Sequence, residues 1–334
     1  MIDELDGQII HSLQIFPRAS FRLIADTVGA GEQTVARRYH RLRRDGALRV
    51  VGLIDPRVYG DAQWVVRVQA KPDDIPRLAE ALVRRPEVTH ANILSGWSEL
   101  VCVVRAPIAD GPDGLMRQLP RTTSVIDLDV NLVLHTFGEP GTEPWTAYGH
   151  TLDAEQISRI LPRSRGAPST LPPAAPARED QPLFDALAED GRAPHARLAS
   201  HLGWSTARMA RRLAALESAG TLTYDVDILP KQLGFDVSAM IWLTTSPSHL
   251  EEVGQRIAAH AEIASAAAIS GRNNVMAIAI CRDVDHLYRY LAGDFANIAE
   301  VLTYDVTIRT QRLKQTASLI SRGRLIHAKH SVNT

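Results

Sequence analysis

One segment of this chain occurs twice. Residues 6–50 align without a gap with residues 180–224, and twelve of the aligned positions are identical, far more than chance would produce. The correspondence continues, with small shifts, as far as Asp129 and Asp305. The identical pairs in the first stretch include Arg18/Arg192, Ala25/Ala199, Gly29/Gly203, Arg37/Arg211, Arg38/Arg212 and Gly46/Gly220. A unit of roughly 130 residues is therefore duplicated, and each copy must carry its own fold.

Length and composition agree with two copies. A chain of 334 residues exceeds the size at which one hydrophobic core stops growing, and 45% apolar with 22% charged residues is typical of a soluble globular protein. No apolar stretch is long enough to cross a membrane, and the first residues, Met1-Ile2-Asp3-Glu4, are acidic where a secretion signal would be basic. We therefore expect a cytoplasmic protein with no membrane partner.

Chemical motifs for catalysis or metal binding are missing from the sequence. Cys102 and Cys281 stand at non-equivalent points of the two copies, so we expect buried thiols and neither a disulfide nor a metal pair. The twelve histidines show no metal-ligand spacing, and no P-loop or Gly-x-Ser-x-Gly motif occurs. The sequence predicts no metal, no cofactor and no catalytic residue.

Basic charge is concentrated in the duplicated segment, although the formal net charge of the whole chain is only −1. Between Pro17 and Val50 there are eight arginines and three acidic residues, which gives a local net charge of +5. Between Gly191 and Tyr224, five arginines face one glutamate, a net charge of +4. Such a concentration indicates a polyanionic partner for this element.

Residues 3–45 predict three helices. Asp3 and Ser20 are suitable N-caps for the first two, and Gly29 to Gly31 interrupts the chain before the third. Three apolar positions of the third helix share one face at helical spacing: Val35, Tyr39 and Leu42. The opposite face is cationic. Two helices joined by a glycine-containing turn, the second with a basic outer face, are typical of a helix-turn-helix that enters the major groove of DNA.

Arginine suits DNA contact because its planar fork can grip phosphate oxygens or the guanine edge with two hydrogen bonds. The run from Ala47 to Ile54 is rich in β-formers and predicts a wing, with Arg49 placed for a phosphate. The alternative is a merely solvated helix face, which the duplication disfavours. The predicted DNA-binding residues are Gln33, Thr34, Arg37, Arg38, Arg41, Arg44, Arg49, Arg208, Arg211 and Arg212.

After each helix-turn-helix the pattern changes to strand, helix, strand, strand, helix, strand. This is the order of the ferredoxin-like βαββαβ module, which leaves one sheet face to be covered and so commonly pairs with another module. The predicted fold class is α+β. The expected domains are a winged helix-turn-helix at 1–56, a ferredoxin-like domain at 61–137, a Pro-rich linker with a short helix at 138–179, a second, degenerate helix-turn-helix at 180–230, a second ferredoxin-like domain at 235–312, and a basic tail at 313–334. We expect this tail to be solvated.

The sequence resembles the Lrp/AsnC, or feast/famine, family of transcriptional regulators. The resemblance rests on the opening Leu5 to Gln14, Arg18-Ala-Ser, the turn at Gly29, Thr34 to Arg38, and Asp55-Pro56, followed by the βαββαβ module. It implies a winged helix-turn-helix that binds double-stranded operator DNA. It also implies a RAM or ACT-like module that binds a small effector, commonly an amino acid, and self-associates as a dimer or higher homo-oligomer. The chain is similar to a tandem fusion of two such regulators.

The resemblance further implies an effector loop between the second and third strands of each module. There Glu99 provides an acidic side chain suited to an ammonium group, whereas the second copy has the neutral Asn274. The alternative is that Gly96 and Gly271 simply make tight hairpins. The predicted effector residues are Gly96, Trp97, Ser98, Glu99, Gly271, Arg272, Asn273 and Asn274.

Three questions stay open at this level. The second helix-turn-helix lacks the counterparts of Arg41, Arg43 and Arg44, so it binds DNA more weakly or is purely structural. The two βαββαβ modules pair either within one chain or between chains. Siroheme decarboxylases share this architecture and provide an enzymatic alternative, although His90 is the only histidine near either hairpin. A ligand-sensing adaptor without DNA binding is a third alternative.

Overall fold

The computed structural model describes residues 2–109, 114–122, 124–138, 145–161 and 176–327, and the proline-rich run of the predicted linker lies outside them. The chain forms two compact units, each built from both copies. The helical unit contains Ile2–Asp61, His150–Leu229 and the chain from Thr316 onward. The sheet unit contains Ala62–Gly149 and Pro230–Gln315. The helix-turn-helix segments of both copies therefore share one unit, and the βαββαβ modules of both copies share the other.

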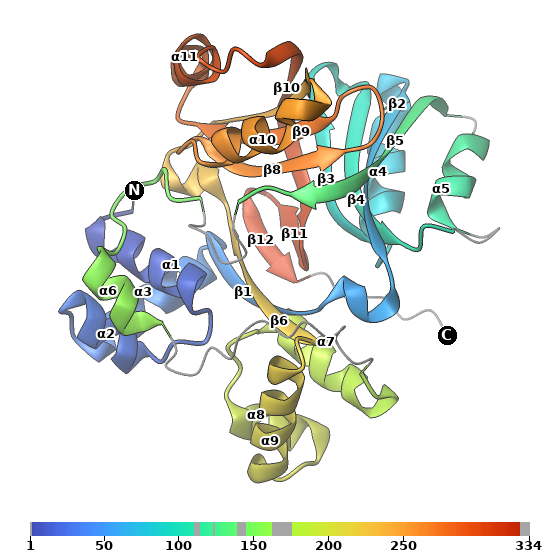
Figure 1. Ribbon diagram of the computed structural model, residues 1–334. Coiled ribbons are helices and arrows are strands. Elements are labelled where there is room, and N and C mark those ends of the chain that lie inside the picture. The colour runs from blue at the N-terminus through green and yellow to red at the C-terminus, as the bar shows by residue number, and fades with distance from the viewer. Residues whose placement is uncertain (1, 110–113, 123, 139–144, 162–175, 328–334) are drawn as a thin grey trace. The chain divides into compact units, whose positions relative to one another are not determined.

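The first bundle of the helical unit has the three helices that the sequence predicts (Figure 1). They are α1 Glu4–Ile15, α2 Phe21–Val28 and α3 Glu32–Arg44. Asp3 caps α1 in a reciprocal capping box with Asp6, and the Ser20 side chain accepts from the Leu23 amide at the start of α2. Gly29 ends α2 at φ +69°, a left-handed conformation that suits glycine. The predicted packing stripe of α3 is buried.

The second bundle repeats this arrangement with α7 Gln181–Glu189, α8 His195–Leu202 and α9 Thr206–Ser218. Its core contains Leu183, Leu187, Leu198, Met209, Leu213 and Leu216. The stripe Met209, Leu213 and Leu216 on α9 stands at the positions of Val35, Tyr39 and Leu42 on α3. The second copy therefore keeps a complete hydrophobic core.

The prediction that residues 47–54 form a wing is wrong. The strand β1 Leu48–Ile54 pairs with β6 Leu222–Ile228 of the other copy in a two-stranded antiparallel ribbon. In this register Val51 lies opposite Asp225, its own counterpart in the second copy, so the ribbon has a pseudo-two-fold axis at its centre. Because β1 contacts α7 and β6 contacts α1, each strand also covers the bundle of the opposite copy.

Two further elements complete the helical unit. The predicted linker helix is present as α6 Ala154–Ile160. The prediction of a solvated tail is wrong as far as His327, because β11 Ser318–Ser321 and β12 Arg324–His327 form an antiparallel hairpin. The backbone of Leu325 donates to the carbonyl oxygen of Gly46 at 2.9 Å, and the buried Leu325 side chain explains why this segment folds back.

The sheet unit contains the two predicted βαββαβ modules (Figure 1). The first consists of β2 Ala62–Ala70, α4 Ile75–Val83, β3 Val88–Leu94, β4 Glu99–Ala106, α5 Leu115–Gln118 and β5 Val125–Thr136. The second consists of β7 Val237–Thr245, α10 Leu250–Ala258, β8 Ile263–Ile269, β9 Val275–Cys281, α11 Val284–Tyr290 and β10 Val301–Gln315. Cys102 and Cys281 are buried free thiols, as expected.

The two modules close one barrel within the chain, which answers the question that the sequence left open. The strands follow the order β3-β4-β2-β5-β8-β9-β7-β10, and β10 pairs with β3 to complete the ring. The joints are equivalent, since Val133 on β5 pairs with Ile269 and Arg309 on β10 pairs with Leu94. Each strand of the ring therefore has a neighbour on both sides.

Both faces of the barrel wall are buried. On β7, Ala239, Ile241 and Leu243 pack towards the helices, whereas Met240 and Trp242 belong to a separate cluster that also contains Val65, Leu94 and Val101 of the first module. Period-two alternation directs these two sets to opposite faces. The second cluster is the shared interior, where apolar side chains of both copies meet.

Candidate nucleic-acid interface and effector loops

The residues on the polar face of helix α3 differ in their exposure and in their contacts with the rest of the bundle. Gln33, Arg37 and Arg44 are exposed, and Thr34 is half-buried near the start of the helix. Arg44 keeps only a 3.4 Å contact with the neighbouring Asp45. These side chains remain available for an external partner, and the helix carrying them is held by the core on its opposite face.

Arg38 and Arg41 are instead engaged within the bundle. Nη1 of Arg38 donates to Oδ1 of Asp3 at 2.6 Å and to Oδ1 of Asp6 at 3.1 Å, while Arg41 pairs with the other oxygen of Asp6. The Asp6 side chain is only 1% exposed, so these arginines neutralise a buried carboxylate. The hydrogen bond from Arg38 holds the pKa of Asp3 below its ordinary value.

The second bundle repeats this clamp with identical residues. Arg212 on α9 donates through Nε to Oδ1 of Asp180 at 2.8 Å, and Asp180 is fully buried. The hydrogen bond from Arg212 lowers the pKa of Asp180. Because the same pair holds the first and third helices in both copies, Arg38 and Arg212 have a structural role, and direct DNA contact by either of them stays a prediction.

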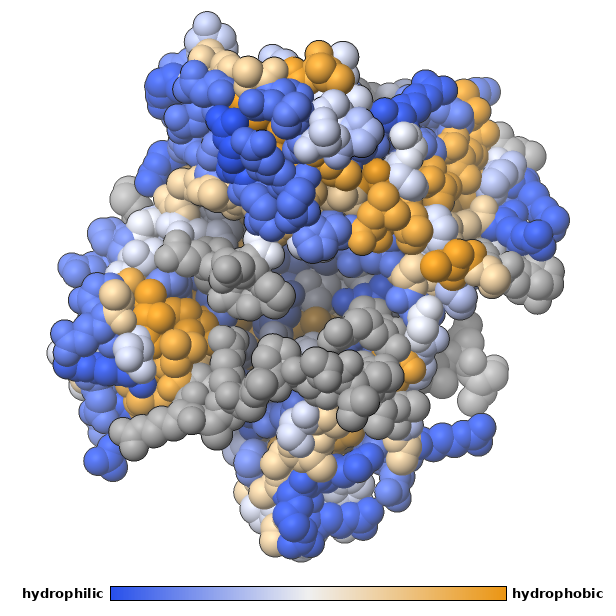
Figure 2. All heavy atoms as spheres, viewed as in Figure 1, coloured by the Kyte–Doolittle hydropathy of each residue, from blue (hydrophilic) through white to orange (hydrophobic). Residues whose placement is uncertain are grey.

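On the rest of α9, Arg211 is exposed, whereas Arg208 lies over the Trp204 ring at 4.2 Å and within 3.7 Å of Glu179. Arg208 is nevertheless half-exposed. The displayed end of this bundle, around α8 and α9, is predominantly hydrophilic (Figure 2). On α9, Arg208 is therefore partly engaged by its own bundle, whereas Arg211 is exposed.

The prediction that Arg49 contacts a phosphate is wrong. Its side chain is 6% exposed and donates to Ser318 Oγ at 2.9 Å and to the carbonyl oxygen of Glu189 at 2.8 Å. Ser318 in turn donates to Asp227, which lies directly opposite Arg49 in the β1–β6 ribbon. Burial lowers the pKa of Arg49 and raises that of Asp227 to about 7. The pattern of β-formers located the strand correctly but could not reveal the hairpin that covers it.

Two arginines outside the recognition helices join the bundles reciprocally. Arg192 donates to the carbonyl oxygens of Pro17 and Ala19, each at 2.7 Å. Arg18 donates to the equivalent carbonyl oxygens, those of Gly191 and Ala193. Arg43 adds an ion pair with Asp190 at 2.7 Å. The identity of Arg18 and Arg192 in the duplicated segment was the sequence signal for this contact, since neither lies on a recognition helix.

The first effector loop joins β3 to β4 and contains Gly96, Trp97 and Ser98. Gly96 has φ +84°, and the half-exposed Trp97 has φ +51°, which is uncommon for a non-glycine residue. Glu99 does not point into solvent. Its carboxylate is buried and pairs with Arg67 Nε at 2.6 Å, and the Arg67 guanidinium lies 4.4 Å over the Trp242 ring of the second module. The carboxylate predicted for an ammonium group therefore already has a cationic partner.

The second loop joins β8 to β9 and is fixed by backbone contacts. The Asn274 side chain accepts from the Thr245 amide at 3.0 Å and donates to the Thr245 carbonyl at 2.7 Å, while Thr244 Oγ1 approaches both the Arg272 carbonyl and the Asn273 amide. Gly271 has φ +105°, and a Cβ there would lie 1.9 Å from Asn131 Oδ1. Glycine is thus required by the hairpin in both copies, and effector binding by these residues stays a prediction.

Comparisons with known proteins agree with this architecture. A family model described as the AsnC-type helix-turn-helix domain matches residues 2–43, and one described as the Lrp/AsnC ligand binding domain matches residues 238–319. The HTH-type transcriptional regulator LrpA of Pyrococcus abyssi is 28% identical over 136 residues, which are 40% of this chain and 96% of that protein. The regulatory protein AsnC of Escherichia coli is 26% identical over 134 residues, which are 40% of this chain and 88% of that protein.

A third relative is an uncharacterized HTH-type transcriptional regulator of Pyrococcus furiosus. It is 34% identical over 102 residues, which are 30% of this chain and 69% of that protein. Among solved structures, the siroheme decarboxylase NirDL has the same fold over nearly the whole length, with a TM-score of 0.61, 17% identity, and coverage of 94% of this chain and 93% of that chain. No helix in the described part of the chain is long and apolar enough to cross a membrane.

Proposed function

Because this chain belongs to the Lrp/AsnC family, we propose that it is a DNA-binding transcriptional regulator whose operator affinity is modulated by a small effector. The observation that carries the proposal is the exposed polar face of α3, where Gln33, Arg37 and Arg44 are exposed on a helix whose other face is buried in the core. A preorganised helix of this kind suits the major groove. Such a regulator acts at the chromosome, which places it in the cytoplasm.

The pseudo-two-fold axis of the helical unit shapes the expected operator. Since α3 and α9 are related by this axis, we propose that one chain presents two recognition helices to one duplex. We propose an operator with two related half-sites, of which the α3 half-site is read more strictly. Only Arg211 and the stacked Arg208 remain free of the intrabundle clamp on α9, so the second helix contributes mainly phosphate contacts.

The test is DNA binding by the full chain to sequences selected from a genomic library, followed by fluorescence anisotropy. The variant Arg37→Ala/Arg44→Ala should bind the selected operator at least 10-fold more weakly. If both arginines bind phosphates, the slope of log K against log salt flattens by about 0.9 for each phosphate that is no longer neutralised. Arg211→Ala should have a smaller effect. Unchanged binding by the Arg37→Ala/Arg44→Ala protein would contradict the proposal.

We further propose that an amino acid-like effector binds at the β3–β4 or β8–β9 loop. The half-exposed Trp97 at the first loop provides a fluorescent reporter of occupancy. Amino acids are titrated one at a time. The one that is the effector should change the Trp97 emission, measured against a Trp97→Phe protein, and should shift operator affinity. If no amino acid changes either the emission or the operator affinity, this part of the proposal is contradicted.

A tetrapyrrole enzyme is the competing function because siroheme decarboxylase NirDL shares the fold, a likeness that at 17% identity concerns fold alone. Burial lowers the pKa of His90, beside the first hairpin, to about 3, so its imidazole is neutral. A titration with heme separates the two functions. A saturable Soret shift that His90→Ala abolishes would favour the enzyme over the regulator.

A further inference from the structure

The linker helix α6 packs against both α1 and α2 of the first bundle (Figure 1). The backbone N–H of Leu152, just before α6, donates to His11 Nδ1 at 2.8 Å. Nε2 of Gln156 donates to the carbonyl oxygen of Thr27 at 3.3 Å. Ile160, at the end of the helix, is 0% exposed. This α1/α2 surface thus accepts a short helix with one apolar edge.

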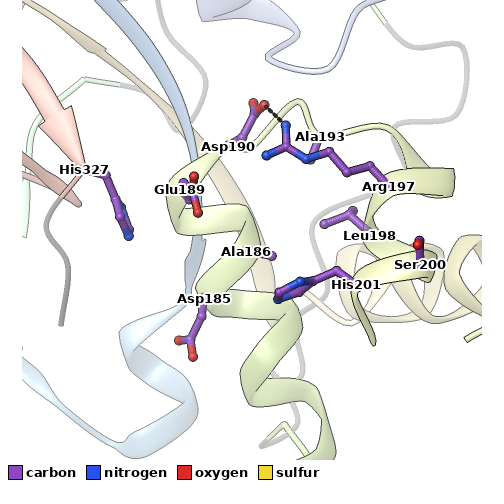
Figure 3. A pocket seen from close by; sticks show the side chains of 10 residues that line it. All are labelled: Asp185, Ala186, Glu189, Asp190, Ala193, Arg197, Leu198, Ser200, His201 and His327. Atoms are coloured by element: carbon purple, nitrogen blue, oxygen red, sulfur yellow. Dashed lines mark ion pairs between the residues drawn. The ribbon is translucent and has the colours of Figure 1, made fainter. Parts of the chain in front are cut away.

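The equivalent surface of the second bundle is an open pocket of about 520 Å³ between α7 and α8 (Figure 3). Asp185 and His201 line it, and they stand at the positions of His11 and Thr27, the two residues that hold α6 on the first bundle. Ala186 and Leu198 add apolar lining. The pocket therefore has the location and the backbone framework of a helix-docking groove.

Exposure distinguishes the covered α1/α2 surface from the open groove. His11 and Thr27 are 2% and 3% exposed, whereas Asp185 and His201 are exposed. Within the ranges that the structure describes, no helix packs across α7 and α8 as α6 packs across α1 and α2. Since both bundles have the same three helices, the framework of the open groove is intact.

The α7 edge of the open groove is acidic, while the rest of its lining includes Arg197, His201 and His327. Asp185 and Glu189 replace His11 and Ile15, and Asp190 replaces Phe16. Asp190 is neutralised by Arg43 at 2.7 Å and approached by Arg197 at 3.8 Å, which leaves the exposed carboxylates of Asp185 and Glu189 along the α7 edge (Figure 3). Asp185 accepts a hydrogen bond from Gln181 at 2.8 Å, but neither it nor Glu189 is seen in an ion pair within the described residues. Exposed acids of this kind at a groove edge favour a basic partner.

We propose that the α7/α8 groove docks a short amphipathic helix of a partner protein. Its apolar edge covers Ala186 and Leu198, and its Lys or Arg residues face Asp185 and Glu189. The pairing of α6 with the first bundle supplies the geometry, and the acidic edge supplies the charge. Helix-in-groove recognition uses this combination of apolar anchors and flanking charges. The second bundle then recruits protein where the first reads DNA.

The probe for this site is a labelled peptide of residues 150–161 carrying Glu155→Lys and Ser158→Lys. Residues 155 and 158 are exposed on α6, so the changes add positive charge without altering the buried edge. Titration of the full chain into this peptide, followed by fluorescence anisotropy, should show saturable binding. The unmodified peptide should bind several-fold more weakly because it retains Glu155 and lacks both added lysines.

Two variants locate the binding on the groove. Asp185→Lys/Glu189→Lys should weaken peptide binding at least 10-fold, while Glu80→Lys/Glu252→Lys, a charge-matched change at exposed positions of α4 and α10, should leave it unchanged. Ala186→Trp should block the groove without changing charge. Circular dichroism and the thermal midpoint of each variant show whether it is folded. Absence of binding, or equal losses in the two charge-reversed proteins, would overturn the proposal, and operator binding by the same variants is expected to persist.

Discussion

Identical arginines on the two recognition helices divide into exposed and clamped side chains. Arg37 and Arg211 are exposed, whereas their sequence neighbours Arg38 and Arg212 pair with the buried carboxylates of Asp6 and Asp180. A difference of one residue, about 100° around a helix, separates the two roles. A basic stripe in a sequence therefore overstates the charge that a partner can reach.

Removing a clamp should cost stability without requiring DNA. We expect Arg38→Ala to lower the free energy of unfolding by roughly 1–3 kcal/mol, because Asp6 stays buried with Arg41 as its remaining partner. Arg37→Ala, at the adjacent exposed position, should change it by less than about 0.5 kcal/mol. Urea denaturation of the two proteins makes the comparison, and equal effects would argue against a clamp.

The buried Asp227 makes stability depend on pH. Burial first, and then the nearby Asp225, raise its pKa from 3.8 to about 7, against the opposing effects of Ser318, Thr316 and Arg49. The folded state thus retains a proton that the unfolded state releases, and the resulting stabilisation is present below pH 4 and is lost as pH rises through 7. Asp227→Asn should remove this component, so the stability difference between variant and parent should change between pH 4 and 8.

Urea denaturation at several pH values measures that difference. Asp26→Asn, at an exposed position of α2, is the control and should leave the pH profile of the parent nearly unchanged. Parallel profiles for the parent and Asp227→Asn would show that the carboxyl group is ionised throughout.

At the scale of elements, the C-terminal hairpin β11–β12 makes the two copies unequal. Arg324 donates to the carbonyl oxygen of Arg44, the last residue of α3, and Leu325 pairs with Gly46. The strand β1, predicted as a wing, forms one ribbon with β6, and the hairpin packs on it through Ser318. The recognition helix of the first copy is therefore supported at its C-terminal end by a segment from the far end of the sequence.

Substitution of Gly46 by alanine tests whether the hairpin supports the end of α3. It has φ +73°, and a Cβ there would lie 2.6 Å from Arg324 Cβ, whereas Gly220, its counterpart at φ +69°, has open space. Both alanine variants carry the same backbone strain, about 1 kcal/mol. Gly46→Ala should cost a further 1–3 kcal/mol or so from overpacking and should speed hydrogen exchange of residues 318–327. Equal costs for the two variants would mean that the hairpin is not anchored there.

At the scale of the whole molecule, one chain contains strand pairings between two copies of the same unit, which single-copy chains could make only as a dimer. The barrel closes through β5–β8 and β3–β10, and the ribbon through β1–β6, all within the chain. Any larger homo-oligomer must therefore use other surfaces than these strand edges.

The thermal midpoint should accordingly be independent of protein concentration. Obligate dimers lose stability on dilution by mass action, whereas an intramolecular barrel does not. Differential scanning fluorimetry and calorimetry over a concentration range of about 100-fold make the measurement. A midpoint that rises steadily with concentration would show that folding depends on association between chains.

The sequence by itself determined the local and repeated features. Periodicity, caps and turn glycines located α1, α2, α3 and the strands of both βαββαβ modules, because these signals act within a few residues. The duplication identified two copies of each domain, and the motifs from Leu5 to Pro56 identified the family. The exposure of Arg37 and Arg44 also followed from helical spacing alone.

Only the tertiary structure decided how the copies combine. Pairing of β1 with β6, closure of the barrel, and the burial of Arg49 under β11–β12 depend on contacts between residues far apart in sequence, and one-dimensional patterns carry no information about those partners. Whether Arg38 or Glu99 is free likewise depends on a distant counter-ion, Asp6 or Arg67. The sequence could therefore place a charge on a face, but only packing decided whether that face meets solvent, a partner or the core.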